Sequence, residues 1–178
     1  MEEAQVIDLV RAGEVDAFAE IVEHYQAPIQ RYLYRLTGDY QMAQDLAQDT
    51  FLQAYKGILK TKADLSLKAW LYRIATNNAL QHHRQKRRLS FIPLDECKTS
   101  DIPITENQAS LVGEKMAIQE ALSKVPEEQK TCLVLHFVEG FKYKEIAETL
   151  GISEDAVRKR VARGKQKFRM LYPGGESK

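Results

Sequence analysis

A glycine between two amphipathic segments near the C-terminus constrains the fold of this chain more than any other feature. Ile146, Ala147 and Leu150 recur at helical spacing, and Gly151 follows where a helix would end in a left-handed conformation. Ser153 predicts the N-cap of a second helix. Because the small side chain of Ala147 lets the second helix cross closely, the segment predicts a helix-turn-helix.

The second helix of this motif has two chemically different sides. Its inner side is apolar, with Val157, Val161 and Phe168. Its outer side carries Arg158, Lys159, Ala162 and Arg163. A short helix with a basic outer face fits the major groove of DNA; the alternative is an ordinary helical hairpin with a solvated charged side. The agreement of turn glycine, cap, crossing residue and basic face favours DNA binding.

Positive charge is concentrated in two places, although the 178-residue chain has a net charge of only +1. Residues 84–88 and 158–169 are rich in Lys and Arg and contain no acid. The segment 89–112 between them has one lysine against four acids. Two basic clusters separated by an acidic spacer predict two separate contacts with nucleic acid.

The same acidic spacer divides the chain. Pro93 and Pro103, together with the lack of helical periodicity around them, predict a linker. We therefore expect a first helical domain at residues 1–88, a linker at 89–112, a second helical domain at 113–172 and a tail at 173–178. The sequence contains no strand-like alternation flanked by hairpin turns, so the expected fold class is all-α, with the helix-turn-helix in the second domain.

The sequence also predicts several absences. Cys97 and Cys132 have neither CxxC spacing nor paired histidines, so we expect no metal site, and Cys132 lies in an apolar run that predicts a buried thiol. No apolar run is long enough for a signal peptide or a membrane span, so we expect a cytoplasmic protein. The sequence contains no glycine-rich phosphate loop and no Ser/His/Asp set. We therefore expect no enzyme activity, no cofactor and no small-molecule substrate.

Turn residues divide the first domain. Gly13 predicts a turn between two helices, and Asp16 is the expected cap of the second. Pro28 predicts the start of a further helix, which Gly38 ends.

The helix that follows is strongly amphipathic. Leu46, Ala47 and Phe51 can face a core. The face expected to be exposed consists of Asp45, Gln48, Asp49, Leu52 and Gln53. An acidic and amide face with an embedded leucine suits the docking of a basic partner helix; the alternative is a solvated helix face.

The last long helix of the first domain, predicted at 66–88, contains no acid. Leu67 and Leu71 supply its buried side. The residues that recur every three or four positions on another side are Arg73, Asn77, Gln81, Arg84 and Arg88. Amide and guanidinium groups pair with base edges and phosphates, so this side predicts a contact with nucleic acid. We expect His82 and His83 to belong to the same basic surface.

Taken together, these features resemble the extracytoplasmic-function class of bacterial sigma-70 factors along nearly the whole chain. Four blocks carry the resemblance in the order found in the family: residues 45–52 (DLAQDTFL), 70–77 (WLYRIATN), 125–130 (VPEEQK) and 143–153 (YKEIAETLGIS).

The resemblance implies a role for each part. The exposed face of 45–53 would dock on the clamp helices of the β' subunit of core RNA polymerase. The helix-turn-helix would read the promoter −35 element with Ser153, Arg158, Lys159, Ala162 and Arg163. The promoter −10 element would be opened, and one flipped base held, by Lys62, Asp64, Lys68, Arg73, Asn77, Gln81, Arg84 and Arg88. The resemblance also implies promoter DNA and an anti-sigma factor, often membrane-anchored, as partners.

Four positions depart from the family pattern. Lys142 stands where a capping Ser or Thr is common, Asn78 occupies a usually apolar position, and Gln81 replaces a frequent Asp. Gly164 replaces a common alanine, at a cost of up to about 1 kcal/mol in helix propensity unless close packing requires it.

Two other classes of protein remain open from the residues alone. A conventional DNA-binding regulator would use the C-terminal motif and leave the exposed face of 45–53 unexplained. An RNA-binding or RNA-modifying protein would use the basic clusters on structured RNA, but the sequence offers neither a catalytic set nor exposed aromatic stacking platforms. Binding to core RNA polymerase separates the sigma-factor interpretation from both.

Overall fold

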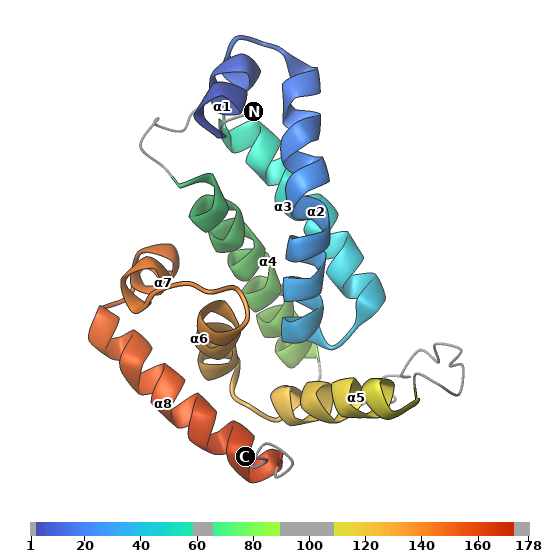
Figure 1. Cartoon of the computed structure of the whole chain (residues 1–178), viewed down its shortest axis with the longest axis vertical. Coiled ribbons are helices and arrows are strands. Elements are labelled where there is room, and N and C mark those ends of the chain that lie inside the picture. Colours follow the sequence, from blue (N-terminus) through green and yellow to red (C-terminus); the bar gives the residue numbers. More distant parts are fainter. Residues whose placement is uncertain (1–2, 59–65, 90–108, 173–178) are drawn as a thin grey trace.

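The structure, a computed structural model, describes residues 3–58, 66–89 and 109–172 (Figure 1). Over these ranges it consists of eight helices and the turns between them, which confirms the all-α class. The helices are α1 (Glu3–Arg11), α2 (Val15–Thr37), α3 (Tyr40–Ile58), α4 (Leu67–Leu89), α5 (Ala109–Ser123), α6 (Glu127–Phe137), α7 (Tyr143–Leu150) and α8 (Glu154–Leu171).

Helices α1–α4 form the first body, in which α2, α3 and α4 pack against one another and α1 covers one end. Ile29, Leu33 and Leu71 are fully buried at its centre. A polar pair is enclosed with them: the Thr76 hydroxyl donates to the Tyr72 carbonyl (2.7 Å), so Tyr32 Oη donates to Thr76 Oγ1 (2.7 Å). Burial raises the pKa of Tyr32. The buried hydroxyl groups of Tyr32 and Thr76 are therefore both paired, as buried polar groups usually are.

Helix α2 passes through Pro28 without interruption, so the prediction that a new helix starts there is wrong. Proline removes one hydrogen bond from the ladder, but Tyr25 before it and Ile29 after it are buried in the same core, and their burial outweighs that loss. The expected cap Asp16 is also wrong, because the N-cap position is Glu14 and Asp16 lies in the first turn. The left-handed turn at Gly38 (φ 74°) is confirmed.

Helices α6, α7 and α8 pack against one another as the second body, which contains the predicted helix-turn-helix as α7 and α8, and α5 packs against both α2 and α8. Gly151 ends α7 in the left-handed region (φ 65°) and Ser153 Oγ accepts a hydrogen bond from the Ala156 amide (3.2 Å), so both expectations are confirmed. Lys142 cannot accept a capping bond, but the Glu145 carboxylate accepts one from its backbone amide (2.6 Å).

Gly164 lies where α8 crosses α6. A Cβ atom added there would come within 2.8 Å of Leu133 Cδ1 and 3.2 Å of Gln129 Cβ. Close packing therefore requires the glycine, and its low helix propensity is the consequence of a tight crossing.

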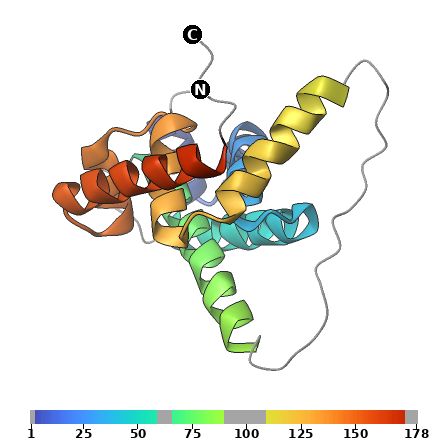
Figure 2. The ribbon, with the colours of Figure 1, turned by 90° about the horizontal axis from the view of Figure 1, so that it is seen from below.

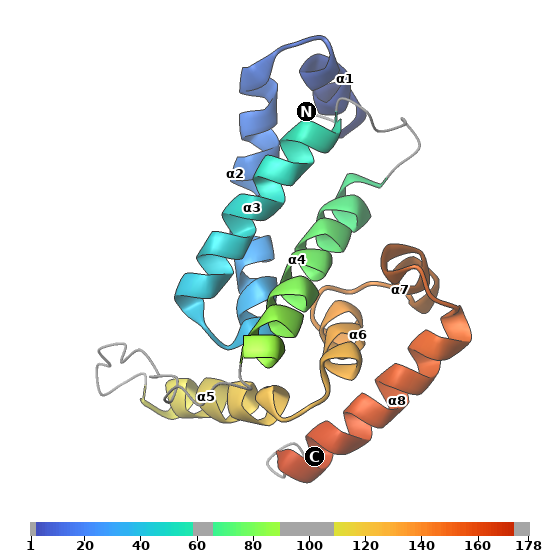
Figure 3. The ribbon, with the colours of Figure 1, turned by 180° about the vertical axis from the view of Figure 1, so that it is seen from behind.

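The two bodies are in contact. α2 packs against α5 and α6, and α7 packs against α4. Seen from behind, α4 lies with α3 on one side and α7 on the other (Figure 3). Seen from below, α5 and the C-terminal half of α4 project in different directions from the junction (Figure 2). α5 begins at Ala109, inside the segment assigned to the linker.

Candidate nucleic-acid interface

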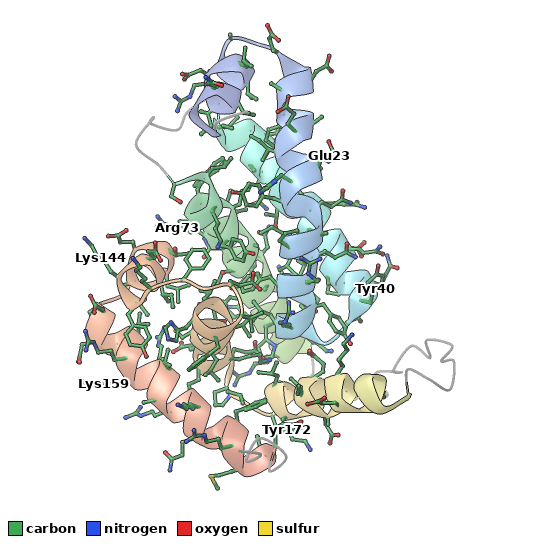
Figure 4. All side chains as sticks on the ribbon, viewed as in Figure 1. Glu23, Tyr40, Arg73, Lys144, Lys159 and Tyr172 are labelled. Carbon is green, nitrogen blue, oxygen red and sulfur yellow. The ribbon has the colours of Figure 1, made fainter. Side chains whose placement is uncertain are left out.

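Helix α4 presents a basic and amide-rich face along its whole length. Leu67, Leu71 and Ala75 are buried against the first body. The side chains exposed on the other side include the predicted Arg73, Asn77, Gln81, Arg84 and Arg88. Figure 4 labels Arg73 on this helix. Since α4 contains no acid, this face has positive potential toward its last turn, as a surface for phosphates requires.

Two further predicted residues, Lys62 and Asp64, lie outside the described residues. The remaining one, Lys68, is described and exposed, and it contacts residues outside α4. Its ammonium group donates to the Glu139 carbonyl (2.9 Å) and lies 4.7 Å from the centre of the Phe141 ring. Both partners belong to the second body, so the structure joins Lys68 to the other predicted DNA-binding part of the chain.

Helix α8 presents the second basic face. Val157 and Val161 are buried, and the predicted Arg158, Lys159, Ala162 and Arg163 are all exposed. Figure 4 labels Lys159 at the outer edge of the molecule.

The first two basic residues of this face have acidic partners one turn earlier on the same helix. Arg158 Nη2 lies 2.6 Å from Glu154 Oε1, and Lys159 Nζ lies 2.7 Å from Asp155 Oδ2. The Glu154 carboxylate raises the pKa of Arg158, and Lys159 lowers the pKa of Asp155. Exposed pairs of this kind are weak, so both cations can exchange these partners for DNA at little cost.

Helix α3 presents an acidic face on another side of the first body. Asp45, Gln48 and Asp49 are exposed, as predicted, and Leu52 stands out with 58% of its surface accessible. A large exposed leucine amid polar groups is the pattern of a protein contact site.

Beside Leu52 the surface between α2 and α3 is hollowed into a groove of about 500 Å³. Phe51 and Tyr55 line it from α3, and Phe18, Val22 and Gln30 line it from α2. The buried Gln30 side-chain nitrogen has no hydrogen-bond partner among the described residues. Sequence reasoning missed the contribution of α2, because its residues in the groove share the periodicity of ordinary core residues.

Gln53, the fifth residue of the predicted docking face, is exposed but contacts α4. Its side-chain amide donates to Asn78 Oδ1 (3.0 Å), and Asn78 donates in turn to Thr50 Oγ1 (3.2 Å). Asn78 is buried, with 8% of its surface accessible. Asn78, a polar residue at a usually apolar position, therefore has two hydrogen-bond partners on α3. These bonds connect α3, which presents the acidic face, to α4, which presents the basic face.

The two histidines of α4 lie away from the exposed basic face. Both His82 and His83 are partly buried in a small cleft between the bodies, and His83 Nδ1 is 3.7 Å from Glu127 Oε1 of α6. Burial, and then the nearby Lys86, lower the pKa of His82. Over the described ranges, no group of three His, Cys, Asp or Glu residues is arranged to hold a metal ion.

Cys132 is fully buried in α6, as predicted, and burial raises the pKa of its thiol to about 11. Cys97 lies outside the described residues. In the part of the chain that the structure describes, no helix is both long enough and apolar enough to cross a membrane.

Comparison with known sequences separates the chain into the same two halves. The family model Sigma-70 region 2 matches residues 21–89, and the model Sigma-70, region 4 matches residues 115–168. The ECF RNA polymerase sigma factor SigW of Bacillus subtilis is 30% identical over 173 residues, which cover 92% of each chain. The RNA polymerase sigma-H factor of Pseudomonas aeruginosa is 29% identical, over 93% of this chain and 91% of the relative.

Solved structures show the same fold at lower identity. CnrH, in its complex with the cytosolic domain of CnrY, matches with a TM-score of 0.74 at 21% identity, over 98% of this chain and 99% of CnrH. The sigma factor RpoE of Bartonella quintana, in complex with the anti-sigma factor NepR, matches with a TM-score of 0.72 at 20% identity, over 92% of this chain and all of RpoE.

Proposed function

Because the chain belongs to the extracytoplasmic-function class of the sigma-70 family, we propose that its three exposed faces divide the tasks of promoter recognition. The protein is an RNA polymerase sigma factor, which directs core polymerase to a set of promoters. The distribution of charge on the surface is the observation that supports this division of tasks. The exposed side of α3 is acidic, whereas the exposed sides of α4 and α8 are basic. α4 lies in the half that matches region 2, and α8 lies in the half that matches region 4.

The acidic face of α3 is the docking site for core polymerase in this proposal. Asp45, Gln48 and Asp49 offer carboxylates and amides to the basic clamp helices of the β' subunit, and Leu52 offers an apolar anchor beside the groove. An exposed apolar anchor with a charged rim is the usual composition of a protein interface. Gln53 belongs to the same docking face in this proposal, and its side-chain amide donates a hydrogen bond to Asn78 of α4.

The basic face of α4 is the proposed site for the −10 element. Arg73, Arg84 and Arg88 carry fixed positive charge for the phosphates, and Asn77 and Gln81 carry amides that can bond to base edges. Lys62, Asp64 and Lys68 complete the predicted set, which would hold one base outside the stack. Flipping a base costs a few kcal/mol, and contacts of this number and charge can offset it.

The outer face of α8 is the proposed reader of the −35 element. Its first turns carry Arg158, Lys159, Ala162 and Arg163, and Ser153 caps its N-terminus, where backbone amides favour a phosphate.

Regulation by an anti-sigma factor is also part of the proposal. Two structural neighbours were solved as complexes, CnrH with the cytosolic domain of CnrY and RpoE with the anti-sigma factor NepR. In this proposal the protein acts in the cytoplasm, where its polymerase is. It contributes binding energy to initiation, while the bond-forming chemistry belongs to the polymerase.

Run-off transcription of fragmented genomic DNA tests the proposal directly. Core polymerase is incubated with and without this protein, and the transcripts are sequenced. We expect discrete new transcripts whose upstream regions share a pair of sequence elements. If a folded protein free of inhibitor yields no new transcript, the polymerase-docking assignment is wrong and the protein acts as a conventional regulator.

A further inference from the structure

A chain of three hydrogen bonds runs from the surface of α3 into the contact between α3 and α4. The exposed Gln53 donates from Nε2 to Asn78 Oδ1 (3.0 Å), and Asn78 Nδ2 donates to Thr50 Oγ1 (3.2 Å). Thr50 Oγ1 donates in turn to the Leu46 carbonyl (2.7 Å). Because the hydroxyl of Thr50 uses its hydrogen in that last bond, its oxygen can only accept from Asn78, and the chain has a single direction.

Asn78 is the member of this chain that belongs to α4. Its side chain is buried, and Thr50 is fully buried. It lies three residues after Ala75 and seven after Leu71, so it continues the buried side of the helix. Apolar contacts have no preferred direction, whereas hydrogen bonds do. Asn78 therefore fixes the orientation of α4 against α3 in a way that an apolar residue at this position would not.

The side of α4 adjacent to Asn78 is the one that the proposed function assigns to the −10 element. Asn77 and Gln81 are exposed there. Their amides can bond to base edges only over a narrow range of distances. A rotation of α4 by about 10° would move a group at the helix surface, roughly 5–6 Å from the axis, by about 1 Å. The orientation of α4 therefore decides whether these amides reach the bases.

We propose that Asn78 is a positioning residue for the reading of the −10 element. Its bonds to Gln53 and Thr50 hold α4 in the rotation at which Asn77 and Gln81 meet base edges. Asn78 does not touch the DNA itself, because its side chain is buried against α3. The inference rests on the proposed function, since it takes the exposed side of α4 as the reader of the −10 element.

The test uses two variants of the full chain, Asn78→Leu and Asn78→Ala, in transcription by core polymerase at saturating protein. Both variants remove the bonds to α3; leucine keeps the branched shape of asparagine, and alanine avoids any steric overlap. The template is a promoter identified by run-off transcription, with each base of its −10 and −35 elements substituted in turn. The measured quantity is the ratio of transcript from the parent promoter to transcript from each substituted promoter.

We expect both variants to reduce this ratio by roughly fivefold or more for at least one base of the −10 element, which is the lower end of what one base contact contributes. The ratios for the −35 element should stay at the wild-type values, because α8 belongs to the other body. A variant that only contains less folded protein would transcribe every promoter less and leave all ratios unchanged. The −10 ratio therefore separates positioning from a loss of stability.

Thr76→Val is the matched control. Thr76 is buried on α4 like Asn78, but its hydroxyl bonds to Tyr32 of α2. The substitution removes a buried hydrogen bond of α4 and leaves the bonds of Asn78 to α3 in place. We expect wild-type ratios for both promoter elements, together with a lower urea midpoint of unfolding. An equal loss of the −10 ratio in Thr76→Val would overturn the proposal, because the loss of any buried bond of α4 would then suffice.

Two further outcomes would overturn the positioning role and leave the proposed function in place. These are unchanged −10 ratios in both Asn78 variants, and equal losses at the −10 and −35 elements. If the wild type itself transcribes equally from every −10 substitution, the assignment of α4 to the −10 element is wrong, and the positioning role falls with it. The wild-type ratios alone thus distinguish the two failures.

Discussion

Lys130 of α6 donates a hydrogen bond to the Leu36 carbonyl of α2, 3.0 Å away, with only 3% of its surface accessible. Leu36 belongs to the last turn of α2, whose carbonyls have no partner within the helix. A cation from the second body therefore caps a helix of the first, and Glu127 Oε1, 2.7 Å from the same ammonium group, balances its charge.

Replacing this lysine should destabilise the protein. In Lys130→Ala the Leu36 carbonyl and Glu127 lose a buried charged partner, so we expect the free energy of unfolding to fall by about 1–3 kcal/mol. Urea denaturation followed by circular dichroism measures the change. Lys124→Ala, which removes an exposed lysine paired with Glu120, is the control and should change stability by less than about 0.5 kcal/mol. Equal effects of the two variants would contradict the role of Lys130.

Gly164 and Gly113 should respond to alanine in opposite directions. Alanine improves helix propensity by about 1 kcal/mol at either site. At Gly164 the new methyl group would overlap Leu133, and overpacking costs about 1–3 kcal/mol. At Gly113 in α5 no atom lies within 4 Å of the new group. We expect Gly164→Ala to lower the free energy of unfolding and Gly113→Ala to raise it. A stabilising Gly164→Ala would show that α6 and α8 do not cross so closely.

Acid should weaken the fold through His82. Burial and the neighbouring Lys86 lower its pKa in the folded chain below the ordinary 6.5, so the unfolded chain binds the proton more readily. The stability that follows from this difference is present above pH 6.5 and is lost as the pH falls through the lowered pKa. Denaturation at pH 7.5 and 5.5 should show a smaller loss in His82→Asn than in the wild type. Parallel losses would exclude His82 as a source of the pH dependence.

Asp49→Lys should abolish binding to core polymerase while leaving the fold intact. The side chain is exposed on α3, so the substitution disturbs no packing but reverses the charge presented to a basic partner. Competition with a labelled sigma factor for core polymerase measures the effect. Glu20→Lys, an equal charge change at an exposed position on α2, should compete like the wild type. If Asp49→Lys also competes at the wild-type level, the docking face is elsewhere.

Arg158→Ala should weaken transcription that depends on the −35 element without changing association with core polymerase. The guanidinium group lies in the second turn of α8, where a helix in the major groove meets base edges. Loss of one such contact corresponds to about 1–3 kcal/mol, or roughly 5- to 150-fold in promoter binding. Arg169→Ala, in the last turn of α8, is the control. The assignment would be wrong if the wild type transcribed equally well from promoters with a scrambled −35 sequence.

Local chemistry explains which parts of this structure could be predicted from the sequence. The turn at Gly38, the helix end at Gly151 and the cap at Ser153 depend on residues within one helical turn, so each was predicted correctly. The buried and exposed sides of α3, α4 and α8 follow from apolar periodicity, which is equally local.

The remaining features depend on residues far apart in the chain. The prediction at Pro28 is wrong because the burial of Tyr25 and Ile29 in the core of the first body keeps α2 continuous, whereas the local preference of proline indicates a helix start. The partners of Asn78 lie 25 and 28 residues away on α3, and those of Glu139 lie 67 residues or more away. Contacts between residues so far apart in the chain produce no periodic pattern in the sequence. The groove beside Leu52 and the contact between the bodies therefore could not be predicted from the sequence.

The burial of Cys132 has a practical consequence for handling the protein. With a pKa of about 11, on the order of one thiol in ten thousand is ionised at neutral pH, and no part of the side chain meets solvent in the folded state. An oxidant or alkylating reagent therefore reaches this sulfur only when α6 detaches from its neighbours. In a Cys97→Ser background, the rate at which Cys132 is labelled therefore measures how often the second body opens transiently.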